Sequence, residues 1–137
     1  MLHKITLLFS FLLLSTVISA QKSVNMDLIV KQGKLYFLDS QLFNGEAYSK
    51  FDNGALGMKG VFKNGDREGL WTWWYSNGKK KRETTFKDGK KEGLTTYWHI
   101  NGVKSKEIIY KSDKNVDQKL WDENGNRLPN PSFQQSY

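Results

Sequence analysis

The sequence predicts an all-β fold: a single elongated antiparallel β-meander, built from β-hairpin repeats of about 24 residues, that follows an N-terminal signal peptide. Three observations predict this class. Aromatic residues make up 14% of the chain beside 12 glycines and only 2 prolines, a composition typical of strands joined by tight turns. Similar blocks begin at Gly45, Gly69 and Gly93, and each block carries an Asn-Gly pair between two aromatic-containing runs.

Residues 1–20 predict a signal peptide. Lys4 precedes an apolar run from Ile5 to Leu14, and the segment ends in small residues up to Ala20. The apolar run is too short to span a bilayer comfortably, so we expect cleavage after Ala20 and a periplasmic or secreted protein. The sequence contains no cysteine, which excludes disulfides, thiolate metal sites and a lipidated cysteine.

The rest of the chain divides by its periodicity. We expect a lead-in strand over residues 21–34 and the hairpin repeats over residues 35–127. We expect residues 128–137 to form a C-terminal tail, either as an extended end or as a cap strand. The repeats keep glycines, Asn-Gly pairs and a closing aromatic at one step along the chain. These structural repeat positions are Gly45, Gly69 and Gly93; Asn53 and Gly54, Asn77 and Gly78, Asn101 and Gly102; and Phe62, Phe86 and Tyr110.

Each copy has the pattern of a β-hairpin. Asn-Gly is the pair best able to adopt positive φ at both central positions, so we expect a type I′ turn at Asn53-Gly54 and at its two equivalents. A short glycine-containing link such as KDGKKEG then turns the chain into the next hairpin. The result is a meander of roughly seven to nine antiparallel strands.

The repeated pattern G-x-W-x-x-W/Y-Y-x-N-G-K-x-K-x-E-x-x-(F/Y)-K-x-G-K-x-x-G resembles the MORN-repeat variant family, which includes proteins labelled as YwqK-type toxin–antitoxin system antitoxins. The resemblance covers roughly residues 35–127 and implies a MORN-like hairpin array. The first copy departs from the pattern, because Ser49 and Lys50 stand where the second has tryptophans, and Gly57 and Gly60 interrupt its second strand. We therefore expect the first hairpin to be less regular than the other two.

The stretch GLWTWWYSNG predicts aromatic side chains on both faces of the sheet. Because side chains alternate along a strand, Trp71, Trp73 and Tyr75 share one face and Trp74 lies on the other. The first group is typical of a core. The second is compatible either with packing or with an exposed recognition stripe. The candidate partner-binding residues are Trp74, Trp98, Trp121, Lys79, Lys80, Lys81 and Arg82.

The basic residues also leave two interpretations open. The formal net charge is +7, and lysines recur at the repeat period beside glutamates. Such lysines commonly solvate sheet edges and discourage aggregation. The functional alternative is a site for anionic envelope lipid, cell-wall glycan or an acidic protein. We expect no nucleic-acid partner for an exported chain, and homo-oligomerisation through the last hairpin is compatible with an open sheet end.

Catalytic motifs are absent from the sequence. His99 is the only histidine after the expected leader, and it falls in an aromatic column where packing is the simpler role. We therefore expect a non-enzymatic protein without a cofactor or metal. Three hypotheses follow: a scaffold that binds a protein partner, a YwqK-type antitoxin that binds a toxin, as the family resemblance implies, and a module that adheres to an envelope surface.

Overall fold

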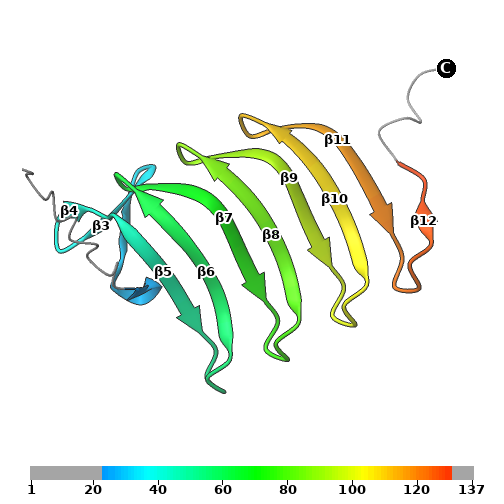
Figure 1. The fold of residues 1–137 in the computed structure, drawn as a ribbon, viewed down its shortest axis with the longest axis horizontal. Coiled ribbons are helices and arrows are strands. Elements are labelled where there is room, and N and C mark those ends of the chain that lie inside the picture. The colour runs from blue at the N-terminus through cyan, green and yellow to red at the C-terminus, as the bar shows by residue number, and fades with distance from the viewer. Residues whose placement is uncertain (1–22, 131–137) are drawn as a thin grey trace, which may run out of the picture.

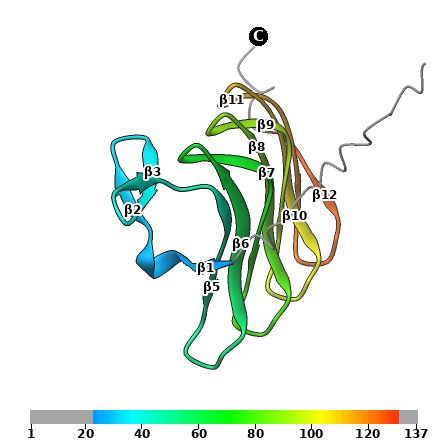
Figure 2. The same ribbon diagram turned by 60° about the vertical axis from the view of Figure 1, so that its left-hand side comes forward.

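The computed structural model of the chain describes residues 23–130 and contains two β-sheets (Figures 1 and 2). Within these residues the large sheet has the strand order β1-β5-β6-β7-β8-β9-β10-β11-β12, and the small sheet has the order β2-β3-β4. The strands of the large sheet are β1 (Val24–Asn25), β5 (Gly45–Lys50), β6 (Leu56–Lys63), β7 (Asp66–Trp74), β8 (Lys80–Lys87), β9 (Lys90–Trp98), β10 (Lys104–Lys111), β11 (Lys114–Trp121) and β12 (Arg127–Leu128). The strands of the small sheet are β2 (Val30–Gln32), β3 (Leu35–Leu38) and β4 (Gln41–Leu42). The expected signal peptide, its cleavage site and residues 131–137 of the expected tail lie outside the described residues.

The predicted all-β meander of hairpins is confirmed. Each strand from β5 to β12 pairs antiparallel with the next, and the hairpins β5–β6, β7–β8 and β9–β10 correspond to the three complete copies. The short hairpin β11–β12 follows as a fourth, truncated copy, with the sequence KLWDENGNR. Figure 1 shows these strands side by side in chain order. Over residues 23–130, no helix has the length and apolar character needed to span a membrane.

The segment before the repeats differs from the single lead-in strand expected for residues 21–34. Its described part contains β1, a 3₁₀ turn η1 (Met26–Leu28) and β2. The chain leaves β1 because the side chain of Asn25 accepts a hydrogen bond from the Asp27 amide and so caps η1. β1 pairs in parallel with β5, and β2, β3 and β4 form a separate sheet. The antiparallel meander is therefore preceded by a parallel edge strand and by a second sheet that the sequence did not predict.

The turn chemistry also differs from the prediction. Among the Asn-Gly turns, only the glycines have positive φ, with values of 82°, 82° and 93° at Gly54, Gly78 and Gly102. The Gly54 amide donates to the Phe51 carbonyl, and the Phe51 amide donates to the Ala55 carbonyl. This is the pattern of a type I turn followed by a glycine bulge. Asparagine keeps negative φ because its Oδ1 accepts a hydrogen bond from the amide two residues on.

The turns with positive φ at both centres lie instead in the links between copies. Those in the links are Asn64-Gly65, Asp88-Gly89 and Ser112-Asp113, with φ between 48° and 77°, and Asp39-Ser40 between β3 and β4 has the same signs. On either side of these links the flanking residues already pair, as Lys63 does with Asp66 and Lys87 with Lys90. Only two residues are left to reverse the chain, and a type I′ turn does so. The sequence therefore predicted both reversals correctly but assigned the type I′ geometry to the wrong one.

Side-chain hydrogen bonds connect neighbouring Asn-Gly turns. The Nδ2 atoms of Asn53, Asn77 and Asn101 donate to backbone carbonyls of the next turn, at Ser76, Ile100 and Glu123, over 3.0, 3.4 and 2.9 Å. Each asparagine thus closes its own turn through Oδ1 and joins the following copy through Nδ2. These paired bonds explain why asparagine repeats at this position although it does not adopt positive φ.

Replacing Asn101 by alanine is expected to lower the free energy of unfolding by about 1–2 kcal/mol, since it removes two exposed hydrogen bonds. Asn101→Asp keeps the Oδ1 acceptor but loses the Nδ2 donor, so it should lose roughly half as much. Urea denaturation of the two variants measures the difference. Equal losses, or none, would contradict the double role of this side chain.

The core lies between the two sheets at the β5–β7 end of the large sheet. Figure 2 shows the small sheet opposite this end. Phe62 of β6 is central, with its ring centroid 4.7 Å from that of Tyr36, 5.5 Å from that of Phe43 and 4.8 Å from that of Trp71. Tyr36 and Phe43 come from β3 and from the residue that follows β4, so the small sheet covers this face of the large sheet. Trp71 is 1% exposed.

Candidate functional site

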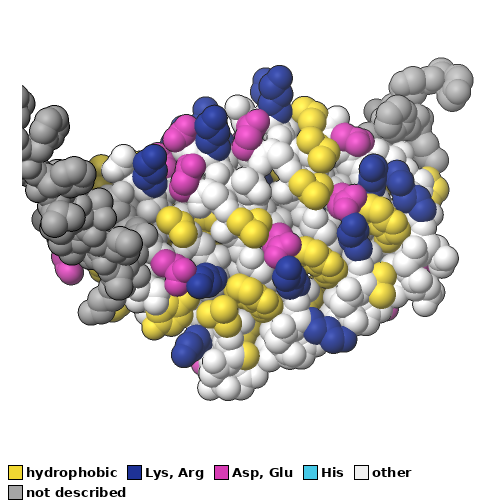
Figure 3. Space-filling model, viewed as in Figure 1, with side chains coloured by type: hydrophobic (Ala, Val, Ile, Leu, Met, Phe, Trp, Pro, Cys, Tyr) yellow, Lys and Arg dark blue, Asp and Glu magenta, His cyan; other side chains and the backbone are white. Residues whose placement is uncertain are grey.

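Trp71 and Trp73 lie on the face of the large sheet that packs against the small sheet. Trp74, the next residue, therefore points to the opposite face, which the small sheet does not cover. Figure 3 looks onto this opposite face, where hydrophobic side chains lie among acidic and basic ones. The sequence left open which face is buried, and in the structure Trp71 lies in the core and Trp73 packs against it.

Tryptophan and lysine alternate across five strands on this face. In order they are Trp74 of β7, Lys80 of β8, Trp98 of β9, Lys104 of β10 and Trp121 of β11, and we call this set the tryptophan–lysine ladder. Trp74 pairs with Lys80, and Trp98 pairs with Lys104. The Lys80 Nζ atom lies 5.7 Å from the Trp98 ring centroid, and the Lys104 Nζ atom lies 5.3 Å from that of Trp121. The three indoles are half-buried.

The lysines of the ladder are held by ion pairs within their own strands. Lys80 Nζ lies 2.6 Å from Glu83 Oε1, and Lys104 Nζ lies 2.5 Å from Glu107 Oε1. Exposed pairs of this kind contribute about 0–1 kcal/mol to stability. Their main effects here are to orient each ammonium group toward a neighbouring indole and to balance its charge locally.

Apolar side chains extend the ladder along the same face. Leu70 is 58% exposed, Leu94 46% and Ile109 39%, and Leu94 pairs directly with Ile109 across β9 and β10. These three residues alternate with buried neighbours in their strands, so they share the face of the ladder. We call the ladder and these three residues together the ladder face. It combines indoles, aliphatic side chains and neutralised charges.

The structure separates the seven candidate residues predicted from the sequence. Trp74, Trp98, Trp121 and Lys80 lie together in the ladder. The other cations do not join them: Lys79 Nζ donates to the Asn101 carbonyl, Lys81 Nζ lies 5.5 Å from the Tyr75 ring centroid, and the Arg82 guanidinium carbon lies 3.5 Å from the Trp73 ring centroid on the core face. These four cations, although consecutive in the sequence, therefore lie in different surroundings.

A β-bulge causes this separation. Trp73 pairs with Arg82 but Trp74 pairs with Lys80, so Lys81 is an extra residue in β8. In a regular strand Lys80 and Arg82 would share a face, whereas the extra residue places them on opposite faces. The same register shift occurs between Lys104 and Lys106 in the next copy. Lys104 was missed as a candidate, although it stands one repeat after Lys80.

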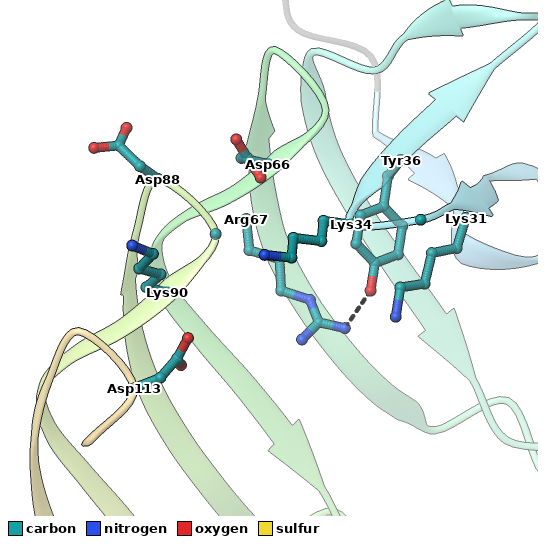
Figure 4. Close-up of a pocket in the computed structure, with 10 residues that line it drawn as sticks. Lys31, Lys34, Tyr36, Asp66, Arg67, Asp88, Lys90 and Asp113 are labelled. Atoms are coloured by element: carbon teal, nitrogen blue, oxygen red, sulfur yellow. Dashed lines mark hydrogen bonds between the residues drawn. The ribbon is translucent and has the colours of Figure 1, made fainter. Parts of the chain in front are cut away.

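Arg67, another residue that sequence reasoning missed, joins the two sheets on the opposite face (Figure 4). Its Nη2 atom donates to Tyr36 Oη over 2.6 Å, which is the dashed line in the figure. Its guanidinium carbon lies 5.3, 5.2 and 5.3 Å from the ring centroids of Tyr36, Trp71 and Phe86. A cation enclosed by three rings gains cation–π attraction, so Arg67 has a structural role here.

The pocket beside Arg67, with a volume of about 300 Å³, is lined by charges of both signs. Lys31 and Lys34 come from the small-sheet side, and Lys90 from β9. Asp66 comes from the start of β7, and Asp88 and Asp113 come from the links between copies. This mixture gives no clear preference for an anion or a cation, and the pocket is a weaker candidate site than the ladder face.

Two polar residues near the turns serve the backbone. His99 Nε2 lies 3.0 Å from the Trp121 carbonyl oxygen, which connects the third copy to the fourth. Asp122 closes the last turn, and hydrogen bonds from the Asn126 side chain and the Asn126 amide hold its pKa below its usual value. Neither residue lies in a catalytic arrangement with the other candidates described above.

Comparison with known proteins places a family match on one hairpin. Residues 67–88, which run from β7 through an Asn-Gly turn and β8 into the next link, match the family model of the MORN repeat variant. The chain therefore carries a MORN repeat, and the match supports the resemblance to that family. No curated protein and no solved structure was found to match the chain.

Proposed function

We propose that the chain is a non-enzymatic, exported repeat module that binds a protein partner through the ladder face. The observation that carries this proposal is the alternation of indoles and ion-paired lysines across β7 to β11. Tryptophan is the residue most enriched in binding hot spots, and exposed apolar side chains around it exclude water from such sites. Leu70, Leu94 and Ile109 provide such a surround.

The ion pairs favour a protein partner over an anionic lipid or glycan surface. Lys80 and Lys104 are each bonded to a glutamate, so the ladder itself carries little net positive charge. An anionic surface would instead require free cations, and its attraction would be screened by salt. A protein partner can use the indoles and the aliphatic residues directly, with the paired charges providing orientation.

The resemblance to YwqK-type antitoxins extends the proposal to the class of partner. On this reading the partner is a toxin met outside the cytoplasm, and the ladder face covers part of it. A toxin gene beside this gene would support the extension. Co-expression of that toxin with the wild-type chain should then restore growth, whereas co-expression with a ladder variant should not.

The proposal is tested by capture from an envelope extract, with the chain from Gln21 as bait. The ladder variant is Trp98→Ala with Trp121→Ala, which leaves the core unchanged. The matched control is Leu28→Ala with Val30→Ala, which removes exposed apolar groups at the small-sheet end, where these residues are 64% and 57% exposed. Circular dichroism verifies the fold of each bait.

We expect one protein to be retained by the wild-type and control baits at both physiological and high salt, and to be lost from the ladder variant. Retention of that protein by the ladder variant would contradict the proposal. Capture of only lipid or wall material, released by moderate salt, would contradict it as well and would support envelope adhesion.

A further inference from the structure

A second candidate site lies on the face of the large sheet opposite the ladder face. It is at the end of the sheet that carries the Asn-Gly turns. It is a cavity with a volume of about 440 Å³ between η1, the β5–β6 turn region and the ends of β7, β8 and β9. This volume falls within the range of small-molecule sites. The cavity belongs to neither the ladder nor the Arg67 pocket, and of the ladder residues only Trp74 reaches its rim.

The walls of the cavity are mainly apolar. Met58 of β6 is 8% exposed and Trp73 of β7 packs against the core, and both line the cavity. Met26 of η1 and Phe51 of the β5–β6 turn also line it, and Tyr97 contributes from β9. Two thioethers beside aromatic rings provide an adaptable surface, because methionine fits ligands of different shape.

The charged groups at the cavity are predominantly cations. Lys50, Lys81 and Arg82 line it together with one carboxylate, Asp27, so three positive charges face one negative charge. Lys50 and Lys81 are exposed, with their Nζ atoms 5.9 and 5.5 Å from the ring centroids of Tyr48 and Tyr75. The excess of positive charge favours an anionic ligand.

Among these cations, Arg82 is the one whose position is most closely fixed by its neighbours. Its guanidinium carbon lies 3.5 Å from the Trp73 ring centroid and 6.0 Å from that of Tyr97, so its position is set by the rings. Its Nε atom is buried without a hydrogen-bond partner, and among residues 23–130 the guanidinium forms no ion pair. Arg82 also lines the cavity, where the rest of its guanidinium can pair with a carboxylate, an interaction that is stronger than a neutral hydrogen bond.

We propose that this cavity binds a carboxylate carried on an aromatic or aliphatic body, either as a free acid or as the C-terminal end of a peptide. The carboxylate pairs with Arg82, and the body packs against Met58, Phe51 and Trp73. This inference goes beyond the protein-binding function of the ladder face and does not depend on it, because the cavity and the ladder occupy opposite faces.

Calorimetric titration with 3-phenylpropionate tests the inference, with its neutral amide as the matched probe. We expect saturable binding of the acid, and binding of the amide weaker by about tenfold or more, since a hydrogen-bonded charge is lost. This comparison uses the wild-type chain from Gln21, so it does not depend on how any variant folds. Absence of saturable binding, or equal binding of acid and amide, would overturn the proposal.

Arg82→Gln should weaken binding of the acid by about tenfold or more. The matched control is Arg127→Gln, since Arg127 is also stacked on an indole, with its guanidinium carbon 5.5 Å from the Trp121 ring centroid, but lies away from the cavity. The control should keep wild-type affinity. Equal losses in the two variants would place the binding elsewhere and overturn the proposal.

The source of the carboxylate is distinguished by a second pair of probes, N-acetylglycyl-phenylalanine and its C-terminal amide. Tighter binding of the free peptide than of 3-phenylpropionate would support recognition of a chain end. Tighter binding of 3-phenylpropionate would support a free acid. Either order requires that both acids bind more tightly than their amides and that both lose affinity in Arg82→Gln.

Discussion

Replacing Trp71 by alanine is expected to lower the free energy of unfolding by about 3–5 kcal/mol. The indole is 1% exposed and lies between Phe62 and Phe86, at centroid distances of 4.8 and 6.1 Å. Its Nε1 atom donates to the Val61 carbonyl, and its ring is one of the three that enclose Arg67. Alanine would leave a large cavity at the junction of the two sheets and would remove one wall of the Arg67 cage.

Urea denaturation followed by circular dichroism measures this loss, and Trp98→Ala is the matched control. Trp98 is half-buried on the ladder face, so its replacement should cost about 1 kcal/mol or less. A similar loss in both variants would contradict the assignment of one face to the core and the other to solvent. Loss of the native fold in Trp98→Ala alone would reverse that assignment.

Gly60→Ala is expected to destabilise the fold by about 3 kcal/mol or more, although it adds only one methyl group. A Cβ atom at this position would lie 2.1 Å from Trp71 Cδ2 and 2.3 Å from Cε2, so the indole would have to move. The hydrogen bond of Trp71 to Val61 and the packing of its ring against Phe62 oppose such a movement.

The matched control is Gly57→Ala in the same strand. Its added Cβ would lie 3.1 Å from Ser49 Oγ, a small side chain that can rotate, so we expect a loss of about 1 kcal/mol or less. A double variant of Gly60→Ala with Trp71→Leu tests the cause. Its loss should be clearly smaller than the sum of the two single losses, because the clash disappears with the indole. Additive losses would contradict the proposed contact.

Gly60 also illustrates what the sequence could and could not predict. In the sequence it interrupts the second strand of the first copy and makes that hairpin look irregular. In the structure β5 and β6 pair over six residue pairs, and the missing side chain makes room for Trp71 from β7. An apparent departure from the repeat is therefore a packing requirement, which is visible only once the cross-strand neighbour is known.

The repeat period predicted the array of hairpins because each copy carries its own turn residues and aromatic positions. It did not predict the small sheet. Residues 35–44 were assigned to the repeats, whereas β3 and β4 lie with β2 in a separate sheet whose packing depends on Tyr36 and Phe43 reaching Phe62. The choice of buried face followed from that packing. The alternation of side chains along a strand could place Trp71 and Trp73 on the same face, but it could not show which face the small sheet covers.

The candidate site was predicted in part. The sequence assigned Trp74, Trp98 and Trp121 to one face and included Lys80 among the candidates, and the structure adds Lys104 to this set. The run from Lys79 to Arg82 suggested one basic patch, but the extra residue at Lys81 directs its members to different surroundings. A bulge of this kind depends on the register between β7 and β8, which local sequence does not specify.

The most direct test of the proposed function is hydroxyl-radical footprinting of the chain, free and bound to the protein captured by it. We predict that binding strongly reduces oxidation of Trp98, Trp121 and Leu94, and leaves oxidation of Met26 and Phe51 at the cavity unchanged. Unchanged oxidation of Trp98 and Trp121 in the complex would contradict the assignment of the ladder face as the partner-binding surface.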